Sequence, residues 1–195
     1  MVRSFALAMV LIAVFAAPGD LNAQAAPTRE TSSRQDLFVG FSYLFSAYAH
    51  TQLNPVSGGM AGWNAAYAMP HAFSPHFGFK VDVSGHYRSA GYFSPQIYFL
   101  MAGPQFSARA GRSTIFVHAL VGGILASTDV IAQTKSDTVF ATAVGGGLDH
   151  PISARLAWRV NLDWYHGGYQ TNDTNQISEI VNNDARFSTG PVLRF

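Results

Sequence analysis

Charged residues are scarce in this sequence. Asp, Glu, Lys and Arg together make up 12% of its 195 residues, whereas soluble domains average about 25%. Hydrophobic residues account for 48% of the chain and aromatic residues for 13%. Because charged side chains normally cover a surface that faces water, this composition argues against an ordinary soluble globular protein.

Cysteine is absent, and the net charge is close to zero. A chain without cysteine forms no disulfide bond and cannot carry a lipid through a cysteine thioether. The formal net charge is +1 at pH 7, and the chain has no basic stripe or nucleic-acid recognition motif. We therefore expect no nucleic-acid partner.

A long apolar run occurs near the N-terminus, where Arg3 precedes the run Phe5–Ala17 and small residues follow it. This order is typical of a secretory signal peptide, and the run is too short for a membrane-spanning helix. We predict a signal peptide over residues 1–25 and a flexible, polar lead-in over residues 26–35. A retained N-terminal anchor is the alternative.

The rest of the chain lacks both a run of about 18 apolar residues and a helical hydrophobic period, so we expect no transmembrane helix. Inside lipid, only helices and closed barrels satisfy all of their backbone hydrogen bonds. An exported chain with few charges and no spanning helix therefore points to a β-barrel in a membrane.

A period of two residues runs through the chain. In the stretch LAWRVNLDWY (156–165), every second residue is apolar, and Arg159, Asn161 and Asp163 alternate with them. Successive strand side chains point to opposite faces, so one face is apolar and the other polar. The segments of this kind are Leu37–Ser46, Met60–Met69, Phe77–Tyr87, Gln96–Ala108, Thr114–Leu125, Val139–Asp149, Leu156–Tyr165 and Asp184–Phe195. We predict an all-β fold, an eight-stranded antiparallel up-and-down transmembrane β-barrel over residues 36–195.

The predicted connections alternate in length. The short ones are Pro70–His76, Arg109–Ser113 and His150–Arg155, the longer ones are Ala47–Gly59, Ala126–Thr138 and His166–Asn183, and Arg88–Pro95 is intermediate. Outer-membrane barrels have short periplasmic turns and longer external loops, so this order fits a periplasmic N-terminus. Pro104 and Pro191 fall inside predicted strands, where we expect bulges or frayed pairing because proline donates no ladder hydrogen bond.

Alternation alone does not tell whether the apolar face meets lipid or a protein core. Three features favour lipid. Charged residues are scarce, and glycine is frequent on the polar face, which suits a narrow interior. Aromatic residues gather near the strand ends, as they do at membrane interfaces. A soluble lipocalin-like barrel with its apolar face inside is the alternative. The predicted lipid-facing and girdle residues are Tyr43, Trp63, Tyr67, Phe77, Phe79, Trp158, Trp164, Phe187 and Phe195.

Ionisable residues on the polar face are expected to point into the barrel. They are Lys80, Asp82, His86, His118, Asp149, Arg159, Asp163, Arg186 and Arg194. Buried charges persist only when they are paired, and side chains fill the interior of an eight-stranded barrel. We interpret these residues as a structural salt-bridge network that plugs the lumen. A narrow channel for small solutes or ions is the alternative.

Catalytic, metal-binding and cofactor-binding motifs are weak. Asp82, Ser84 and His86 share the inner face of one segment, about 7 Å apart at successive same-face positions, where no lipid substrate reaches them. The glycines at 145–147 precede a strand end and a turn instead of the helix that a phosphate cradle needs, and the histidines lack metal-ligand spacing. We expect no catalysis, metal or cofactor. A lipid-modifying barrel enzyme is the alternative.

Four stretches resemble the OmpA-like eight-stranded outer-membrane barrels: DLFVGFSYLF (36–45), GPQFSAR (103–109), AVGGGLDHPISARLAWRVNLDWY (143–165) and FSTGPVLRF (187–195). The resemblance implies a place among the lipids of the outer membrane of a Gram-negative bacterium. It also implies that the barrel-assembly machinery reads the C-terminal segment ending in Phe195. Because the sequence stops there, we expect the barrel domain only, without a periplasmic wall-binding domain. We expect a structural or surface-interaction role, with an unknown extracellular ligand at external loops such as His166–Asn183.

Overall fold

The computed structural model describes residues 34–51, 54–88, 93–130, 133–167 and 183–195, with their side chains except at 46–51, 54–58, 93–95, 126–130 and 133–137. The predicted signal peptide (1–25), most of the predicted lead-in (26–35) and most of the segment His166–Asn183 lie outside the described residues. In the described part of the chain, no helix is long and apolar enough to cross a membrane.

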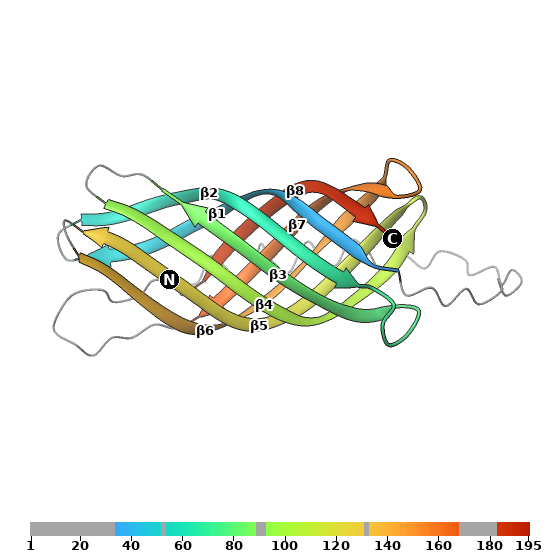
Figure 1. Ribbon diagram of the computed structural model, residues 1–195, viewed down its shortest axis with the longest axis horizontal. Coiled ribbons are helices and arrows are strands. Elements are labelled where there is room, and N and C mark those ends of the chain that lie inside the picture. The colour runs from blue at the N-terminus through green and yellow to red at the C-terminus, as the bar shows by residue number, and fades with distance from the viewer. Residues whose placement is uncertain (1–33, 52–53, 89–92, 131–132, 168–182) are drawn as a thin grey trace, which may run out of the picture. The chain divides into compact units, whose positions relative to one another are not determined.

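Eight strands make up the fold. They are β1 (Asp36–Thr51), β2 (Asn54–Met69), β3 (Phe77–Tyr87), β4 (Phe93–Ala110), β5 (Ser113–Val130), β6 (Gln133–Pro151), β7 (Leu156–Gly167) and β8 (Asp184–Arg194). Each strand pairs antiparallel with the next one in the chain, and β8 pairs with β1, which closes the sheet into a barrel (Figure 1). The prediction of an all-β, eight-stranded, antiparallel up-and-down barrel is confirmed.

The turns after β2, β4 and β6 lie at one end of the barrel, which we call the turn end; the opposite end is the loop end. The two ends of the barrel domain also meet at the turn end, where the backbones of Gln35 and Phe195 exchange two hydrogen bonds of 3.0 and 3.1 Å. The β4–β5 turn is tight, and Gly111 has a φ of 61° there. This left-handed conformation favours glycine because it has no Cβ.

Five strands are longer than the hydrophobic alternation predicts. β1, β2, β4, β5 and β6 contain 16 to 19 residues each. The predicted loops Ala47–Gly59 and Ala126–Thr138 are wrong, because residues 47–51 pair with 54–58 and residues 126–130 pair with 133–137. Backbone hydrogen bonds extend a hairpin whether or not one of its faces is apolar, so the apolar pattern ends before the strand does.

Pro104 and Pro191, the two prolines inside predicted strands, interrupt strand pairing on one side only. Pro104 pairs with β3, whereas the pairing of β4 with β5 stops at Ala102 and resumes in the same register at Gln105. Pro191 pairs with β7, whereas the pairing of β8 with β1 skips it, again without a change of register. The expected fraying therefore occurs at both prolines and no bulge accompanies it, because the ladder loses only the hydrogen bonds on the side that lacks a donor.

Candidate functional site: the barrel wall and the lumen

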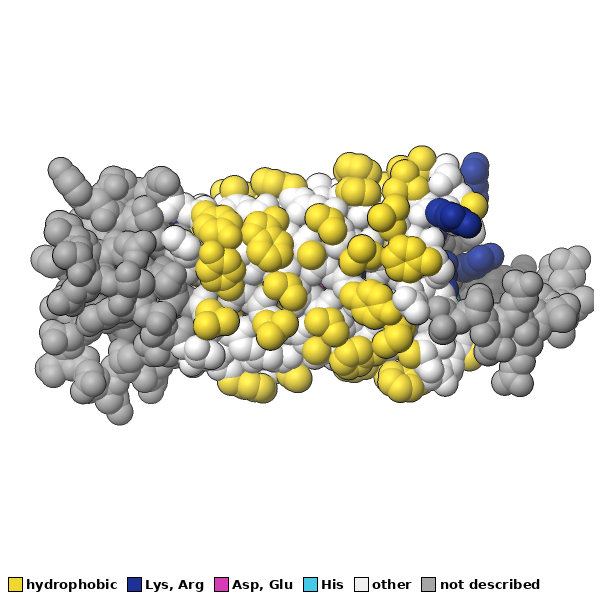
Figure 2. Space-filling view, in the orientation of Figure 1, with side chains coloured by type: hydrophobic (Ala, Val, Ile, Leu, Met, Phe, Trp, Pro, Cys, Tyr) yellow, Lys and Arg dark blue, Asp and Glu magenta, His cyan; other side chains and the backbone are white. Residues whose placement is uncertain are grey.

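The outer wall of the barrel is apolar and exposed. In β7, Trp158, Val160, Leu162 and Trp164 are 43% to 53% exposed, and the residues between them are buried. Among the described strand side chains that point outward, none belongs to Asp, Glu, Lys or Arg. In the view of Figure 2, hydrophobic side chains spread along the barrel, and the Lys and Arg side chains lie at one end. A surface of this kind suits contact with hydrocarbon.

The structure places all of the predicted lipid-facing and girdle residues on the outer face. The exposed ones are Trp63, Phe77, Trp158, Trp164 and Phe195, and the half-buried ones are Tyr43, Tyr67, Phe79 and Phe187. The indole N–H of Trp63 donates to the Tyr87 hydroxyl at 3.2 Å, and that of Trp158 donates to Oγ1 of Thr189 at 2.9 Å. These indole donors are therefore satisfied within the wall, where hydrocarbon would offer them no partner.

An ion-pair network occupies the middle of the lumen, with Arg186 of β8 at its centre. The guanidinium of Arg186 lies 2.6 Å from Oδ2 of Asp163 and 2.9 Å from Oδ1 of Asp82. Asp82 also pairs with Nζ of Lys80 at 3.0 Å, and Asp163 pairs with Nε2 of His118 at 2.7 Å. Every member is buried. The network therefore joins charges from β3, β5, β7 and β8 across the barrel interior.

A second charged cluster lies nearer the turn end. Arg159 binds Asp149 through two hydrogen bonds of 2.7 and 2.9 Å from directly opposite positions in β7 and β6. The Arg159 guanidinium also stacks over the ring of Phe116, 4.5 Å from its centroid, and Arg194 lies 3.3 Å from Asp149. Asp36, which is not among the predicted lumen residues, is buried beside the same arginines. Its place on the face of Gly40 and Ser42 could have revealed it.

Apolar side chains fill the lumen toward the loop end. The interpretation of the lumen as polar throughout is wrong for this part, because inward positions on six strands carry buried hydrophobic residues that pack together. The cluster consists of Leu44, Met60, Ile97, Phe99, Met101, Leu120, Ile124, Ala141, Ala143 and Tyr165. Around Phe99 both faces of β4 are apolar, so the alternation that reveals a polar face disappears there.

Glycines on the inner face leave room for the charged network. A Cβ added at Gly145 would overlap Oδ1 of Asp163 and Nε2 of His118, and one added at Gly147 would overlap the ring of Phe116. The close approach of these side chains to the β6 backbone therefore requires glycine at both positions.

The structure does not assemble the Asp82, Ser84 and His86 side chains into a catalytic triad. Nε2 of His86 hydrogen-bonds Ser42 at 2.9 Å, whereas Ser84 accepts a hydrogen bond of 2.6 Å from Arg186. All of these groups are buried inside the barrel. Within the described ranges, no group of three or more His, Cys, Asp or Glu residues is arranged to hold a metal ion.

A closed eight-stranded antiparallel barrel with an apolar outer wall and its charges inside has the fold of the eight-stranded outer-membrane barrels. Neisserial surface protein A matches the structure with a TM-score of 0.61 and 14% sequence identity, over 84% of this chain and 98% of that chain. Ail, the attachment invasion locus protein of Yersinia pestis, matches with a TM-score of 0.55 and 15% identity, over 84% and 99%.

The outer membrane protein OprG from Pseudomonas aeruginosa matches with a TM-score of 0.56 and 8% identity, over 84% of this chain and 96% of that chain. No protein-family model and no curated protein matches the sequence. At such low identities the likeness concerns the fold alone, and the function has to be argued from this chain's own residues.

Proposed function

We propose that the protein is an integral outer-membrane protein of a Gram-negative bacterium, in which a plugged barrel serves a structural or surface-interaction role. The observation that carries the proposal is the distribution of charge. The outward side chains of the described strands are uncharged, whereas Arg186, Asp163 and Asp82 are buried inside. A soluble barrel has the opposite arrangement, with charges outside and an apolar interior.

Export through the predicted signal peptide would bring the chain to the outer membrane, and outer-membrane lipid would then be its immediate partner. The C-terminal Phe195 is 66% exposed on the outer face, where the barrel-assembly machinery could reach it as the sequence resemblance implies. The turn end would face the periplasm and the loop end the outside. A surface role also agrees with the names of two structural neighbours, a surface protein and an attachment invasion locus protein.

The filled lumen favours a scaffold over a channel. Along the barrel axis, the charged cluster around Arg159, the network around Arg186 and the apolar cluster around Phe99 follow one another, and each consists of buried side chains. Ions would have to separate close ion pairs and cross an apolar layer, and both steps are costly. We therefore propose that the resting barrel does not conduct.

Planar-bilayer recordings test the closed lumen, with a general porin as the positive control. We expect insertion of the purified protein without steady current steps. Regular openings of uniform size would overturn the plugged-lumen proposal and favour the narrow channel. Cell fractionation tests the location, because a protein that stays in the supernatant without detergent would instead be a soluble barrel.

We further propose that the barrel carries out no reaction on membrane lipid. The buried Ser42–His86 pair lies inside the barrel, away from the lipid-facing wall. A nucleophile and its base act only where a substrate reaches them. Lipid A from cells with and without the protein should therefore have the same mass profile, and a lost or added acyl chain would favour the lipid-modifying enzyme.

A further inference from the structure

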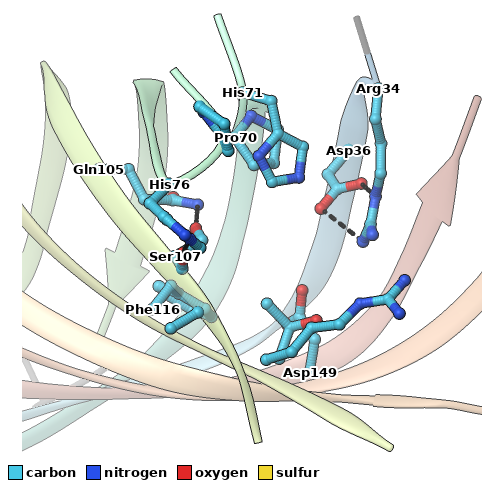
Figure 3. Close-up of a pocket in the computed structure, with 13 residues that line it drawn as sticks. Arg34, Asp36, Pro70, His71, His76, Gln105, Ser107, Phe116 and Asp149 are labelled. Atoms are coloured by element: carbon cyan, nitrogen blue, oxygen red, sulfur yellow. Dashed lines mark hydrogen bonds and ion pairs between the residues drawn. The ribbon is translucent and has the colours of Figure 1, made fainter. Parts of the chain in front are cut away.

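The turn end of the barrel opens into a cavity of about 220 Å³, which we call the vestibule (Figure 3). Residues from β1, β4, β5, β6 and the β2–β3 turn line it. Gln105, Phe116 and Asp149 belong to the buried part of its lining, and His71 and Arg109 belong to its exposed part. The vestibule is thus a recess with both polar and apolar lining residues, open at the turn end.

Positive charge exceeds negative charge around the vestibule. Its lining contains two carboxylates, and each already has a guanidinium partner, because Asp36 pairs with Arg34 at 2.9 Å and Asp149 pairs with Arg159 at 2.7 Å. Four guanidinium groups lie in the lining or within 4.0 Å of these carboxylates, namely those of Arg34, Arg109, Arg159 and Arg194. Four positive charges against two negative charges leave an excess of two positive charges. A dianion would balance this excess.

A buried amide in the lining is only half satisfied. Gln105 is 1% exposed, and its Nε2 donates to Oγ of Ser107 at 3.1 Å, while its Oε1 has no partner among the described residues. Because a serine hydroxyl both donates and accepts, the amide can be turned so that Oε1 accepts from Ser107 and Nε2 is free. Gln105 can therefore offer an N–H group to an anion in the vestibule.

Further hydrogen-bonding groups surround the same space. The ring of His76 donates from Nδ1 to the carbonyl oxygen of Ser107 at 3.2 Å, which fixes the ring against the vestibule. With the proton on Nδ1, Nε2 of the neutral ring is an acceptor, so it can receive a hydrogen bond from a hydroxyl group of a bound ester. The side chain of Thr114 also belongs to the lining. Donors arranged on several sides suit a tetrahedral oxyanion better than a planar carboxylate, which accepts hydrogen bonds mainly in its own plane.

From this geometry we propose that the vestibule binds a small phosphate monoester. The ester's dianionic phosphate accepts hydrogen bonds from Arg109, from the turned amide of Gln105 and from the hydroxyl of Thr114. The uncharged remainder of the ester packs toward Phe116. This site goes beyond the proposed surface role, because it lies at the opposite end of the barrel from the loops.

Calorimetric titration of the folded full chain in dodecyl maltoside micelles tests the proposal, since that detergent carries neither charge nor phosphate. The probes are glycerol 3-phosphate, the dicarboxylate succinate and uncharged glycerol. We expect saturable binding of glycerol 3-phosphate with a Kd below about 10 mM, weaker binding of succinate and no binding of glycerol. Equal binding of succinate, or no saturable binding of the phosphate ester, would overturn the proposal.

A matched pair of variants locates the site. Arg109 near the end of β4 and Arg112 in the β4–β5 turn are both exposed, but only Arg109 lines the vestibule. Arg109→Gln should weaken the binding of glycerol 3-phosphate about tenfold, because it removes a charged donor. Arg112→Gln should change the binding less than about twofold, because an exposed charge outside the vestibule contributes only a screened, long-range attraction to the anion. Equal losses in the two variants would mean non-specific attraction and would contradict a built site.

Micelles doped with phosphatidic acid, a lipid whose headgroup is a phosphate monoester, distinguish a lipid headgroup from a soluble ester. The lipid surrounds the outer wall, whereas the vestibule opens inside the barrel rim. If the lipid competes with glycerol 3-phosphate, and if Arg109→Gln abolishes this competition, the vestibule binds the phosphate of a lipid headgroup as well as that of a soluble ester. A response to the lipid with none to the soluble ester would overturn the proposal.

Discussion

Arg186 illustrates how the lumen manages buried charge at the scale of one residue. Its guanidinium lies between the carboxylates of Asp163 and Asp82, donates to Ser84 and stacks near the Tyr165 ring at 5.0 Å. A buried carboxylate is stable only with a close cation or several hydrogen-bond donors. One arginine therefore stabilises charges contributed by two strands that are not neighbours in the barrel.

Replacing this arginine tests the network. Arg186→Met should lower the free energy of unfolding by about 3 to 5 kcal/mol, because it leaves two buried carboxylates with one fewer cation. Arg112→Met, at an exposed turn position, should change stability by less than about 0.5 kcal/mol. Urea unfolding of the barrel in lipid vesicles measures both. An Arg186→Met barrel as stable as the parent would mean that water reaches these carboxylates.

The sequence predicts most of the charged residues on the inner face, not including Asp36, but it does not predict their partners. Asp163 and Arg186 meet because β7 and β8 place them directly opposite each other, and this register is not visible in the pattern. The contact of Arg186 with Asp82 crosses the lumen and depends on how the closed sheet is tilted. Inward apolar residues such as Phe99 were missed because their outward neighbours are apolar too.

At the scale of the element, β7 is the strand whose two faces differ most clearly. Its outer face runs from Trp158 to Trp164, with Val160 and Leu162 between the two indoles, and every residue of its inner face is buried. Indole rings favour the membrane interfaces, so the two aliphatic side chains fall near the middle of the hydrocarbon.

This placement predicts a cost that depends on depth. Leu162→Arg should destabilise the barrel by about 2 to 4 kcal/mol, whereas Leu156→Arg, on the same face at the turn end, should cost about 1 kcal/mol or less. Urea titration in lipid vesicles gives both free energies of unfolding. If the two substitutions cost the same, the outer face of β7 does not span a hydrocarbon layer.

Strand number and strand order were predictable from the alternating pattern, but strand length was not. The pattern depends on an apolar face, which is required only where the wall meets hydrocarbon. Beyond that zone, hairpins such as β5–β6 continue through backbone pairing alone, as far as Val130 and Gln133. The apolar pattern therefore indicates the extent of the lipid-facing band better than it indicates the ends of the strands.

At the scale of the whole molecule, the closed sheet has no free edge between its first and last strands. β1 pairs with β8 along eight residue pairs. Closure means that every spanning strand has hydrogen-bonded neighbours on both sides.

A barrel closed in this way should resist sodium dodecyl sulfate until it is heated. We expect the unheated protein to migrate differently on a gel from the boiled protein, because the intact barrel stays compact and binds less detergent than the unfolded chain. Comparison of heated and unheated samples of the folded, purified protein measures this directly. Identical migration of the two samples would contradict a stable closed barrel.

The pairing of β1 with β8 also determines when the barrel can close. Asp36 of β1 pairs with Arg194 of β8, so the backbone groups on the edge of β1 away from β2 have no partner strand until β8 is in place. A nascent chain that carries only β1 to β7 exposes two unpaired borders, which hydrocarbon tolerates poorly. We therefore expect a polypeptide truncated anywhere before β8 to leave β1 without its second partner strand and to form no smaller closed barrel.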